Sequence, residues 1–105
     1  SGISGNTFFF AGYPPHKKGR KKFFENLKRI ITEDTVLLYE SPFRILNTLR
    51  MIEEHLGIST YICIARELTK VYEDIQYREV TAIREYFEMH PEKRKGEFVI
   101  IIRSK

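Results

Sequence analysis

Residues 35–44 read Thr-Val-Leu-Leu-Tyr-Glu-Ser-Pro-Phe-Arg, and this stretch decides the fold. The run 36–39 is apolar or aromatic throughout, as expected of a strand buried on both faces. Glu40 and Ser41 end the run, and Pro42 suits the first position of a helix with Ser41 as its N-cap. We therefore predict a strand, a tight turn and a helix. The turn would lie at the carboxyl end of the strand, where open α/β sheets bind ligands; a capped turn without a ligand is the alternative.

The flanking segments repeat this rhythm. Strands are expected at 7–11, 60–65 and 98–102, and helices from Gly19 or Arg20 to about Ile31, at 42–56 and at 81–89. The segments 35–39, 42–56 and 60–65 would form a strand–helix–strand unit whose two strands are neighbours in one sheet. Residues 75–80 fit an edge strand, with a helix as the alternative. The predicted fold is α/β: a mixed, partly parallel sheet of about five strands flanked by about three helices.

The composition is that of one small folded domain. The chain has 105 residues, of which 42% are hydrophobic and 13% aromatic, whereas a disordered chain has few of either. The net charge of +4 and the pI of about 9.3 permit an anionic partner. The single cysteine, Cys63, is predicted to be buried and inert within an apolar strand, which suits a reducing cytoplasm. No apolar run reaches the length of a membrane span.

Metal and nucleophile chemistry find little support in the sequence. The histidines His16, His55 and His90 lie far apart, and no Cys or His stands near them at ligand spacing. Ser41 is better explained as a helix cap than as a nucleophile. The glycine-rich loops that cradle phosphates are absent from the sequence. We expect no metal.

Charged residues follow the predicted strands where each one ends. Glu40 and Ser41 follow one strand, Arg66 and Glu67 follow the next, and Glu97 leads into the last. If the first two strands are neighbours, these side chains converge on one rim of the sheet. A salt bridge between Glu40 and Arg66 is the purely structural alternative.

A basic run precedes the first helix and continues into it, at Lys17, Lys18, Arg20, Lys21 and Lys22. Cations at a helix N-terminus oppose the helix dipole by up to about 1 kcal/mol each. That cost is a mild argument for a use such as neutralising phosphates. A solvated helix start is the alternative.

Four segments together resemble a known family. They are Gly-Tyr-Pro-Pro-His-Lys (12–17), Tyr-Glu-Ser-Pro-Phe-Arg (39–44), Ala-Arg-Glu-Leu-Thr-Lys (65–70) and Lys-Gly-Glu-Phe (95–98). In this order they resemble the C-terminal half of the ribosomal RNA small subunit methyltransferase I family, within the tetrapyrrole (corrin/porphyrin) methylase superfamily. The resemblance covers essentially the whole chain, and Tyr-Glu-Ser-Pro and Arg-Glu-Leu-Thr-Lys are its most specific parts.

The resemblance implies a two-lobe enzyme that binds S-adenosylmethionine in the cleft between its lobes and 2′-O-methylates a cytidine of 16S rRNA. Residues 1–6 would be the remnant of an interdomain linker, and residues 7–105 the C-terminal lobe. The partners would be the missing N-terminal lobe and the small ribosomal subunit in the cytoplasm, with homodimerisation left open and no membrane. This fragment alone would be inactive. The alternatives are a lobe of a tetrapyrrole precursor methyltransferase and a non-catalytic RNA-binding or dimerisation module.

The resemblance also implies roles for individual residues. The cofactor wall would comprise Tyr39, Glu40, Ser41, Ala65, Arg66, Gly96, Glu97 and Phe98. Candidates for a catalytic role are Glu40, Arg66 and Glu67, although the sequence does not say which group accepts the proton. Independently of the resemblance, the basic residues lead us to expect RNA contacts at Lys17, Lys18, Lys21, Lys22, Arg44 and Lys70. No metal is needed, because the sulfonium is already an activated methyl donor.

Overall fold

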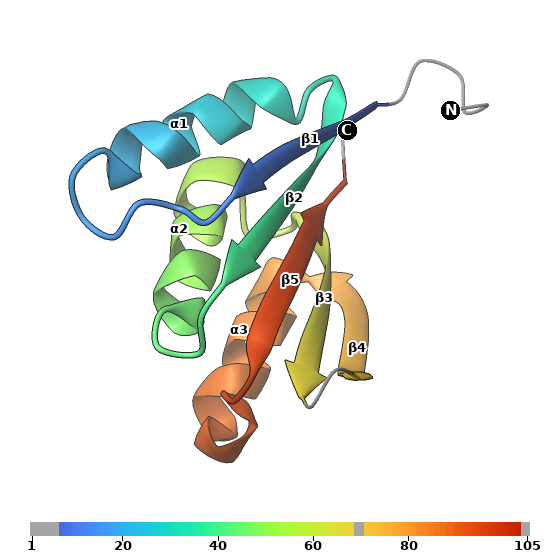
Figure 1. Cartoon of the computed structure of the whole chain (residues 1–105). Helices are drawn as coiled ribbons and strands as arrows, with labels where there is room; N and C mark the ends of the chain where they lie inside the picture. The colour runs from blue at the N-terminus through green and yellow to red at the C-terminus, as the bar shows by residue number, and fades with distance from the viewer. Residues whose placement is uncertain (1–6, 69–70, 104–105) are drawn as a thin grey trace.

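The computed structural model describes residues 7–68 and 71–103, which form an α/β sandwich of one sheet and one helical layer (Figure 1). The elements are β1 (Thr7–Gly12), α1 (Arg20–Ile30), β2 (Asp34–Glu40), α2 (Ile45–Leu56), β3 (Tyr61–Leu68), β4 (Val71–Glu79), α3 (Val80–Met89), the 3₁₀ turn η1 (Pro91–Lys93) and β5 (Glu97–Ile102). The predicted mixed sheet of five strands with three helices is confirmed.

The strand order differs from the sequence prediction at the centre of the sheet. The order is β1-β2-β5-β3-β4, with β1 and β2 parallel and the other three pairings antiparallel. The prediction that β2 and β3 are neighbours is therefore wrong, because β5 lies between them and runs in the opposite direction. β2 and β3 do run parallel to each other, so their carboxyl ends still face the same edge of the sheet.

All three helices lie on one side of the sheet, and the other side carries no helix (Figure 1). The strands alternate accordingly. On the helix side, the fully buried residues include Val36, Leu38, Ile62, Ile64, Phe98, Ile100 and Ile102. These pack against α1, α2 and α3 through residues such as Phe24, Leu49, Ile52, Ile83 and Phe87. We call the side without helices the open face.

Two helices begin elsewhere than the sequence suggested. α2 begins at Ile45 with Arg44 as its N-cap, so the prediction of Pro42 and Ser41 at its start is wrong. Residues 41–44 form a turn instead, in which the Arg44 N–H donates to the Ser41 carbonyl oxygen at 3.1 Å. α3 begins at Val80, one residue before the predicted cap Thr81.

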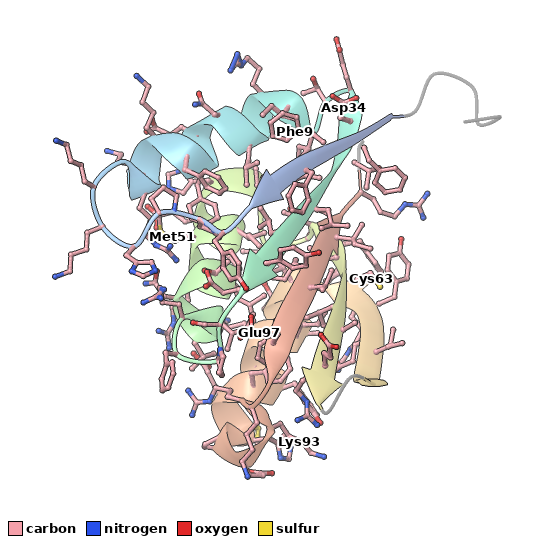
Figure 2. The ribbon with its side chains drawn as sticks, viewed as in Figure 1. Phe9, Asp34, Met51, Cys63, Lys93 and Glu97 are labelled. Carbon is pink, nitrogen blue, oxygen red and sulfur yellow. The ribbon has the colours of Figure 1, made fainter. Side chains whose placement is uncertain are left out.

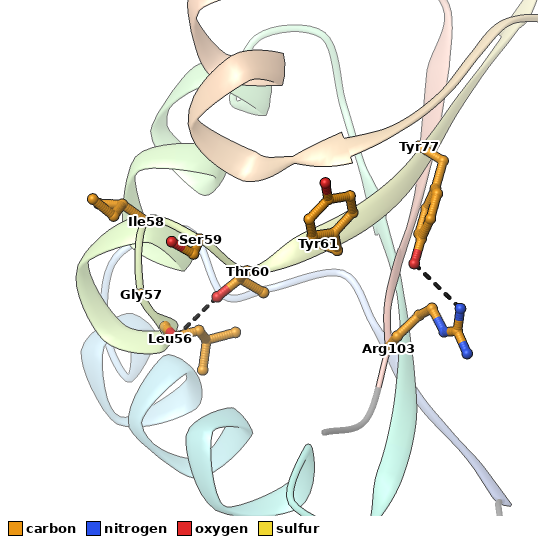
Figure 3. Close-up of a pocket in the computed structure, with 8 residues that line it drawn as sticks. All are labelled: Leu56, Gly57, Ile58, Ser59, Thr60, Tyr61, Tyr77 and Arg103. Carbon is orange, nitrogen blue, oxygen red and sulfur yellow. Dashed lines mark hydrogen bonds between the residues drawn. The ribbon is translucent and has the colours of Figure 1, made fainter.

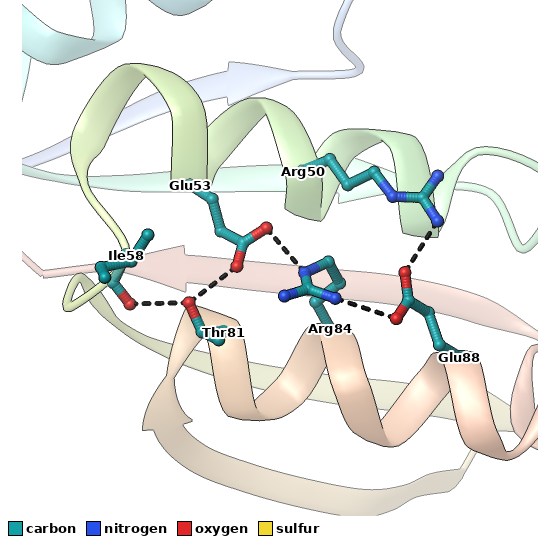
Figure 4. A network of polar contacts seen from close by, with 6 residues as sticks. All are labelled: Arg50, Glu53, Ile58, Thr81, Arg84 and Glu88. Atoms are coloured by element: carbon teal, nitrogen blue, oxygen red, sulfur yellow. Dashed lines mark hydrogen bonds and ion pairs between the residues drawn. The ribbon is translucent and has the colours of Figure 1, made fainter.

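An ionic network joins α2 to α3 (Figure 4). Arg84 donates to Glu53 at 2.7 Å and to Glu88 at 2.8 Å, and Glu88 also accepts from Arg50 at 2.7 Å. The Thr81 hydroxyl donates to Glu53 at 2.7 Å. The side chain that sequence reasoning assigned as a cap thus fixes two helices against each other.

Two further predictions concern single strands. β4 is an edge strand, as expected for residues 75–80, but it runs from Val71 to Glu79, and Val80 already belongs to α3. Cys63 lies in the middle of β3 (Figure 2), but the prediction that it is buried is wrong, since it is half-buried. Its register partner on β5 is Ile101, which belongs to the open face.

None of the helices in the described ranges has the length and hydrophobicity to cross a membrane.

Candidate functional site: one rim with two faces

The loops singled out in the sequence do meet at one rim of the sheet. Phe98 is in register with Glu40 of β2 on one side and with Arg66 of β3 on the other. Glu67 is in register with Glu97 at the start of β5. The two predicted clusters are thus separated by one intervening strand, a distance of about 10 Å between the outer strands.

Strand alternation divides the rim residues between the two faces. Glu40, Arg66 and Phe98 point to the helix side and are 1%, 5% and 0% exposed. Tyr39 and Ala65 point to the open face, where both are half-buried. The residues that the resemblance assigned to one cofactor wall therefore lie on both sides of the sheet.

On the helix side, Glu40 is held by the first residues of the turn and by α2. Its carboxylate accepts hydrogen bonds from the Ser41 N–H at 2.9 Å and from the Thr48 hydroxyl. Arg44 Nε lies 3.8 Å from the same carboxylate. The ion pair formed by Glu40 is thus with Arg44, where the sequence suggested Arg66.

Arg20 extends this cluster to the loop after β1. It donates to the Thr48 hydroxyl at 2.8 Å, to Asn47 at 2.9 Å and to the Pro15 carbonyl oxygen at 2.8 Å. Burial lowers the pKa of Arg20, and the nearby Glu40 carboxylate opposes that effect. The cluster therefore ties three segments of the rim together: the loop after β1, the end of β2 and the start of α2.

On the open face, the rim carries a shallow hollow of about 250 Å³, lined by Tyr13, Tyr39, Glu67, Glu97 and Val99. Figure 2 shows Glu97 at the start of β5, on this part of the sheet. The Tyr13 hydroxyl donates to Glu97 at 2.8 Å, and this hydrogen bond is the main cause that raises the pKa of Tyr13. The Tyr13 and Tyr39 rings lie 5.7 Å apart. The hollow thus combines aromatic faces with two carboxylates.

The remaining predicted site residues occupy different surroundings. Ser41 is half-buried, and within the described residues its Oγ has no hydrogen-bond partner. Gly96 has a φ of 79°, a conformation that glycine adopts freely and that turns the chain into β5. Lys17, Lys18, Lys21 and Lys22 are all exposed, and Lys70 lies outside the described residues.

Sequence reasoning missed Tyr13 and Val99 as residues of the hollow. Tyr13 lies inside the Gly-Tyr-Pro-Pro segment, but its contact with Glu97 joins positions 84 residues apart. Only the strand order, which brings β5 near β1, makes that contact possible. Residues 7–68 and 71–103 contain no cluster of three or more His, Cys, Asp or Glu side chains arranged to hold a metal ion.

The chain is similar to proteins from several bacteria that share one name. The chain is 42% identical over 106 residues to ribosomal RNA small subunit methyltransferase I of Pasteurella multocida, covering 100% of this chain and 37% of the relative. The corresponding Haemophilus influenzae protein is 40% identical with the same coverage. The protein of that name from Thermotoga maritima is 33% identical over 100% of the chain and 45% of the relative. No family model matches the chain.

The chain is homologous to ribosomal RNA small subunit methyltransferase I. The homology extends over its whole length, and the chain spans less than half the length of these relatives. The relatives are methyltransferases named for the ribosomal RNA of the small subunit.

Proposed function

We propose that the chain is the C-terminal lobe of an S-adenosylmethionine-dependent 16S rRNA (cytidine 2′-O) methyltransferase, acting in the cytoplasm. Residues 1–6 would be the linker from an N-terminal lobe, and residues 7–105 would form one wall of the cleft between the lobes. The homology supports the enzyme class. The hollow on the open face is the single observation that supports the cofactor wall.

The residues of the hollow fit the adenosine part of the cofactor. An adenine ring is a flat π-system that stacks on aromatic side chains, and Tyr13 and Tyr39 offer two such faces. Ribose hydroxyls donate hydrogen bonds, which the Glu67 and Glu97 carboxylates are able to accept. The cofactor would supply an activated methyl group. This lobe would orient it toward the 2′-oxygen of the RNA.

The residues on the two faces of the rim would then have different roles: those on the open face would contact cofactor and substrate, and those on the helix side would hold the rim in position. Glu67 is the one candidate catalytic residue that lines the hollow, and its carboxylate is the group we propose to assist with the proton of the 2′-hydroxyl. Glu40 belongs to the cluster on the helix side and would act as a positioning residue. Its hydrogen bonds fix the turn that follows Tyr39.

The hollow is too small to hold the cofactor alone. Its volume of about 250 Å³ falls below the roughly 300–1,000 Å³ of typical ligand pockets, which bury most of a ligand's surface. We therefore expect the 105-residue chain to bind S-adenosylmethionine weakly or not at all. Isothermal titration calorimetry with the chain tests this. Micromolar affinity would contradict the proposal that the cofactor needs a second wall.

The function itself is tested by methyl transfer to purified 30S subunits. A full-length protein that contains this chain should transfer a labelled methyl group to 16S rRNA, and nuclease digestion with mass spectrometry should show 2′-O-methylcytidine. Tyr39→Leu, which removes the aromatic face but keeps an apolar side chain, and Glu97→Gln should lower kcat/KM more than tenfold while each variant stays folded, as thermal unfolding checks. Glu33→Gln removes a carboxylate at the other end of β2 and is the matched control. No 2′-O-methylcytidine in the 16S rRNA would refute the proposal.

A further inference from the structure

A second and larger hollow, whose lining residues Figure 3 shows, lies where β3 begins and β5 ends, and therefore at the end of the sheet opposite to the rim. Its volume is about 610 Å³. One wall is formed by Leu56 at the end of α2 and by the loop 57–60, and the other by the side chains of Tyr61, Tyr77 and Arg103. Tyr61 begins β3, whereas Glu67 of the rim hollow is six residues further along the same strand. At about 3.3 Å per residue, the two hollows are roughly 20 Å apart.

The wall formed by the loop is well fixed. The Thr60 hydroxyl donates to the Leu56 carbonyl oxygen at 2.9 Å, as the dashed line in Figure 3 shows. The Val80 N–H donates to the Thr60 carbonyl oxygen at 2.7 Å. Gly57 makes the turn possible with a φ of 112°. The hollow is therefore a feature of the folded chain rather than the result of a loosely placed loop.

The opposite wall carries two exposed aromatic rings and a cation. Tyr61 is 48% exposed and Tyr77 is 49% exposed, and their ring centroids lie 5.3 Å apart. The Arg103 guanidinium donates to the Tyr77 hydroxyl at 3.2 Å, which places its positive charge beside the ring pair. None of the eight lining residues is acidic. The nearest acidic register position is Glu79, opposite Tyr61 on β4.

This combination matches the chemistry of single-stranded nucleic acid. Proteins hold such strands by stacking bases on aromatic side chains and by contacting phosphates with cations. The cross-strand tyrosine pair also contributes to the pairing of β3 and β4, but about half of each residue stays open to a ligand. The adjacent Arg103 has no acidic side chain among the residues that line the hollow, and a guanidinium is well suited to contact a phosphate.

We propose that this hollow binds one nucleotide of single-stranded RNA, with the base against Tyr77 and Tyr61 and a phosphate at Arg103. The substrate class rests on the proposed function, but the site does not coincide with the proposed cofactor wall. Because the two hollows lie at opposite ends of the sheet, this one holds a nucleotide distant from the methylated position. It therefore contributes to recognition of the RNA and takes no part in the methyl transfer.

The test is binding of a short fluorescein-labelled single-stranded RNA by a full-length protein that contains this chain, measured by fluorescence anisotropy. Tyr77→Leu removes a stacking face and should weaken binding about tenfold. Arg103→Gln should weaken binding as well, and should flatten the log–log salt slope by about 0.7, the value for one lost contact to a single strand. Thermal unfolding confirms that each variant is folded.

Arg78→Gln is the matched control, because it removes the same charge from an exposed position on β4, next to Tyr77 but outside the hollow. It should leave affinity and salt slope unchanged. Equal effects of Arg78→Gln and Arg103→Gln would overturn the inference, since only net charge would then matter. Wild-type affinity in Tyr77→Leu would also overturn it.

Methyl transfer by the wild-type protein to 30S subunits separates the two proposals. If methyl transfer succeeds and both hollow variants bind RNA like wild type, the inference fails while the proposed function stands. If methyl transfer fails but Tyr77→Leu and Arg103→Gln still weaken RNA binding, the RNA site stands and the proposed function fails.

Discussion

At the scale of single residues, Glu40 shows how burial changes the meaning of a charged residue in a motif. The residue is 1% exposed, and its carboxylate is held by the Thr48 hydroxyl, the Ser41 N–H and the Arg44 guanidinium. Removing one member of a buried charged group leaves the others without compensation, which typically costs about 3–5 kcal/mol. Arg44 is partly solvated, and we therefore expect the lower end of this range. Glu40→Ala should reduce the free energy of unfolding by about 3 kcal/mol, measured by urea denaturation.

Glu67→Ala is the matched comparison, because it removes the same side chain from the same rim on the open face. We expect it to change the free energy of unfolding by less than about 1 kcal/mol, as is usual for surface substitutions. If both variants unfolded at the same urea concentration, Glu40 would not have the positioning role assigned to it.

Which face a rim residue occupies was not predictable from the sequence. The sequence of residues 34–40 shows that a charged residue, Glu40, follows an apolar run, and this correctly predicted that Glu40 lies at the rim where β2 ends. It does not show whether the side chain at that edge points to a helix or to solvent. That depends on which face α2 covers, and therefore on contacts such as the one between Thr48 and Glu40.

At the scale of elements, the start of α1 depends on a single glycine. Gly19 is the N-cap and has a φ of 83°, in the left-handed region. A Cβ added there would meet no atom within 4 Å, so a substitution carries only the conformational cost. Gly19→Ala should lower the free energy of unfolding by about 1–2 kcal/mol. Gly19→Asn should lower it less, since Asn tolerates this region better.

Urea denaturation of the two Gly19 variants gives the comparison directly. The result that would contradict the expectation is an alanine variant as stable as the asparagine variant. That outcome would mean that the loop before α1 adopts another conformation at no cost, and that the basic run is not held in the observed position.

The network between α2 and α3 predicts a dependence of stability on pH. Hydrogen bonding to Arg50, with the nearby Arg84, lowers the pKa of Glu88 from its ordinary value of 4.5. The unfolded chain thus binds more protons at this group near pH 4.5, so the contribution is present above that pH. It is lost as the pH falls through the lowered pKa of the folded state.

Glu88→Gln should therefore have a slightly lower Tm than wild type at pH 7, and the difference should shrink as the pH falls below 4.5. Thermal unfolding monitored by circular dichroism at several pH values measures this. Glu54→Gln on α2, which is exposed and outside the network, is the control. A constant difference across the pH range would indicate that the Glu88 carboxylate is not the group responsible.

The elements themselves were largely predictable, but the order of the strands was not. Apolar periodicity located the three α-helices and four of the strands to within a few residues, because burial imposes that periodicity, but it left residues 75–80 open between an edge strand and a helix. The position of β5 between β2 and β3 was missed, since an apolar run such as 98–102 fits any central position. A hydrophobic pattern reports that a strand is buried, whereas the choice of neighbours depends on pairings between distant segments.

At the scale of the whole molecule, where the lysines and arginines lie matters more for RNA binding than the net charge of +4. Lys17 and Lys18 lie in the loop that also carries Tyr13 of the rim hollow, and Arg20 fixes that loop to α2. The basic run therefore starts at the same rim as the proposed cofactor wall. Phosphates of an RNA substrate that reach this rim would meet the exposed lysines.

This arrangement predicts a salt dependence that is specific to one end of α1. In a full-length protein that contains this chain, replacing Lys17, Lys18, Lys21 and Lys22 by alanine should weaken binding to 30S subunits. Each lost phosphate contact should flatten the log–log salt slope by roughly 0.7–0.9.

Two double variants, Lys17→Ala/Lys18→Ala and Lys28→Ala/Arg29→Ala, distinguish a local effect from an effect of net charge. Both remove two exposed charges, one before the start of α1 and the other in its last turn. Only the first pair should flatten the slope. If the two pairs behaved alike, the lysines would act through net charge, and the run would be no more than a solvated helix start.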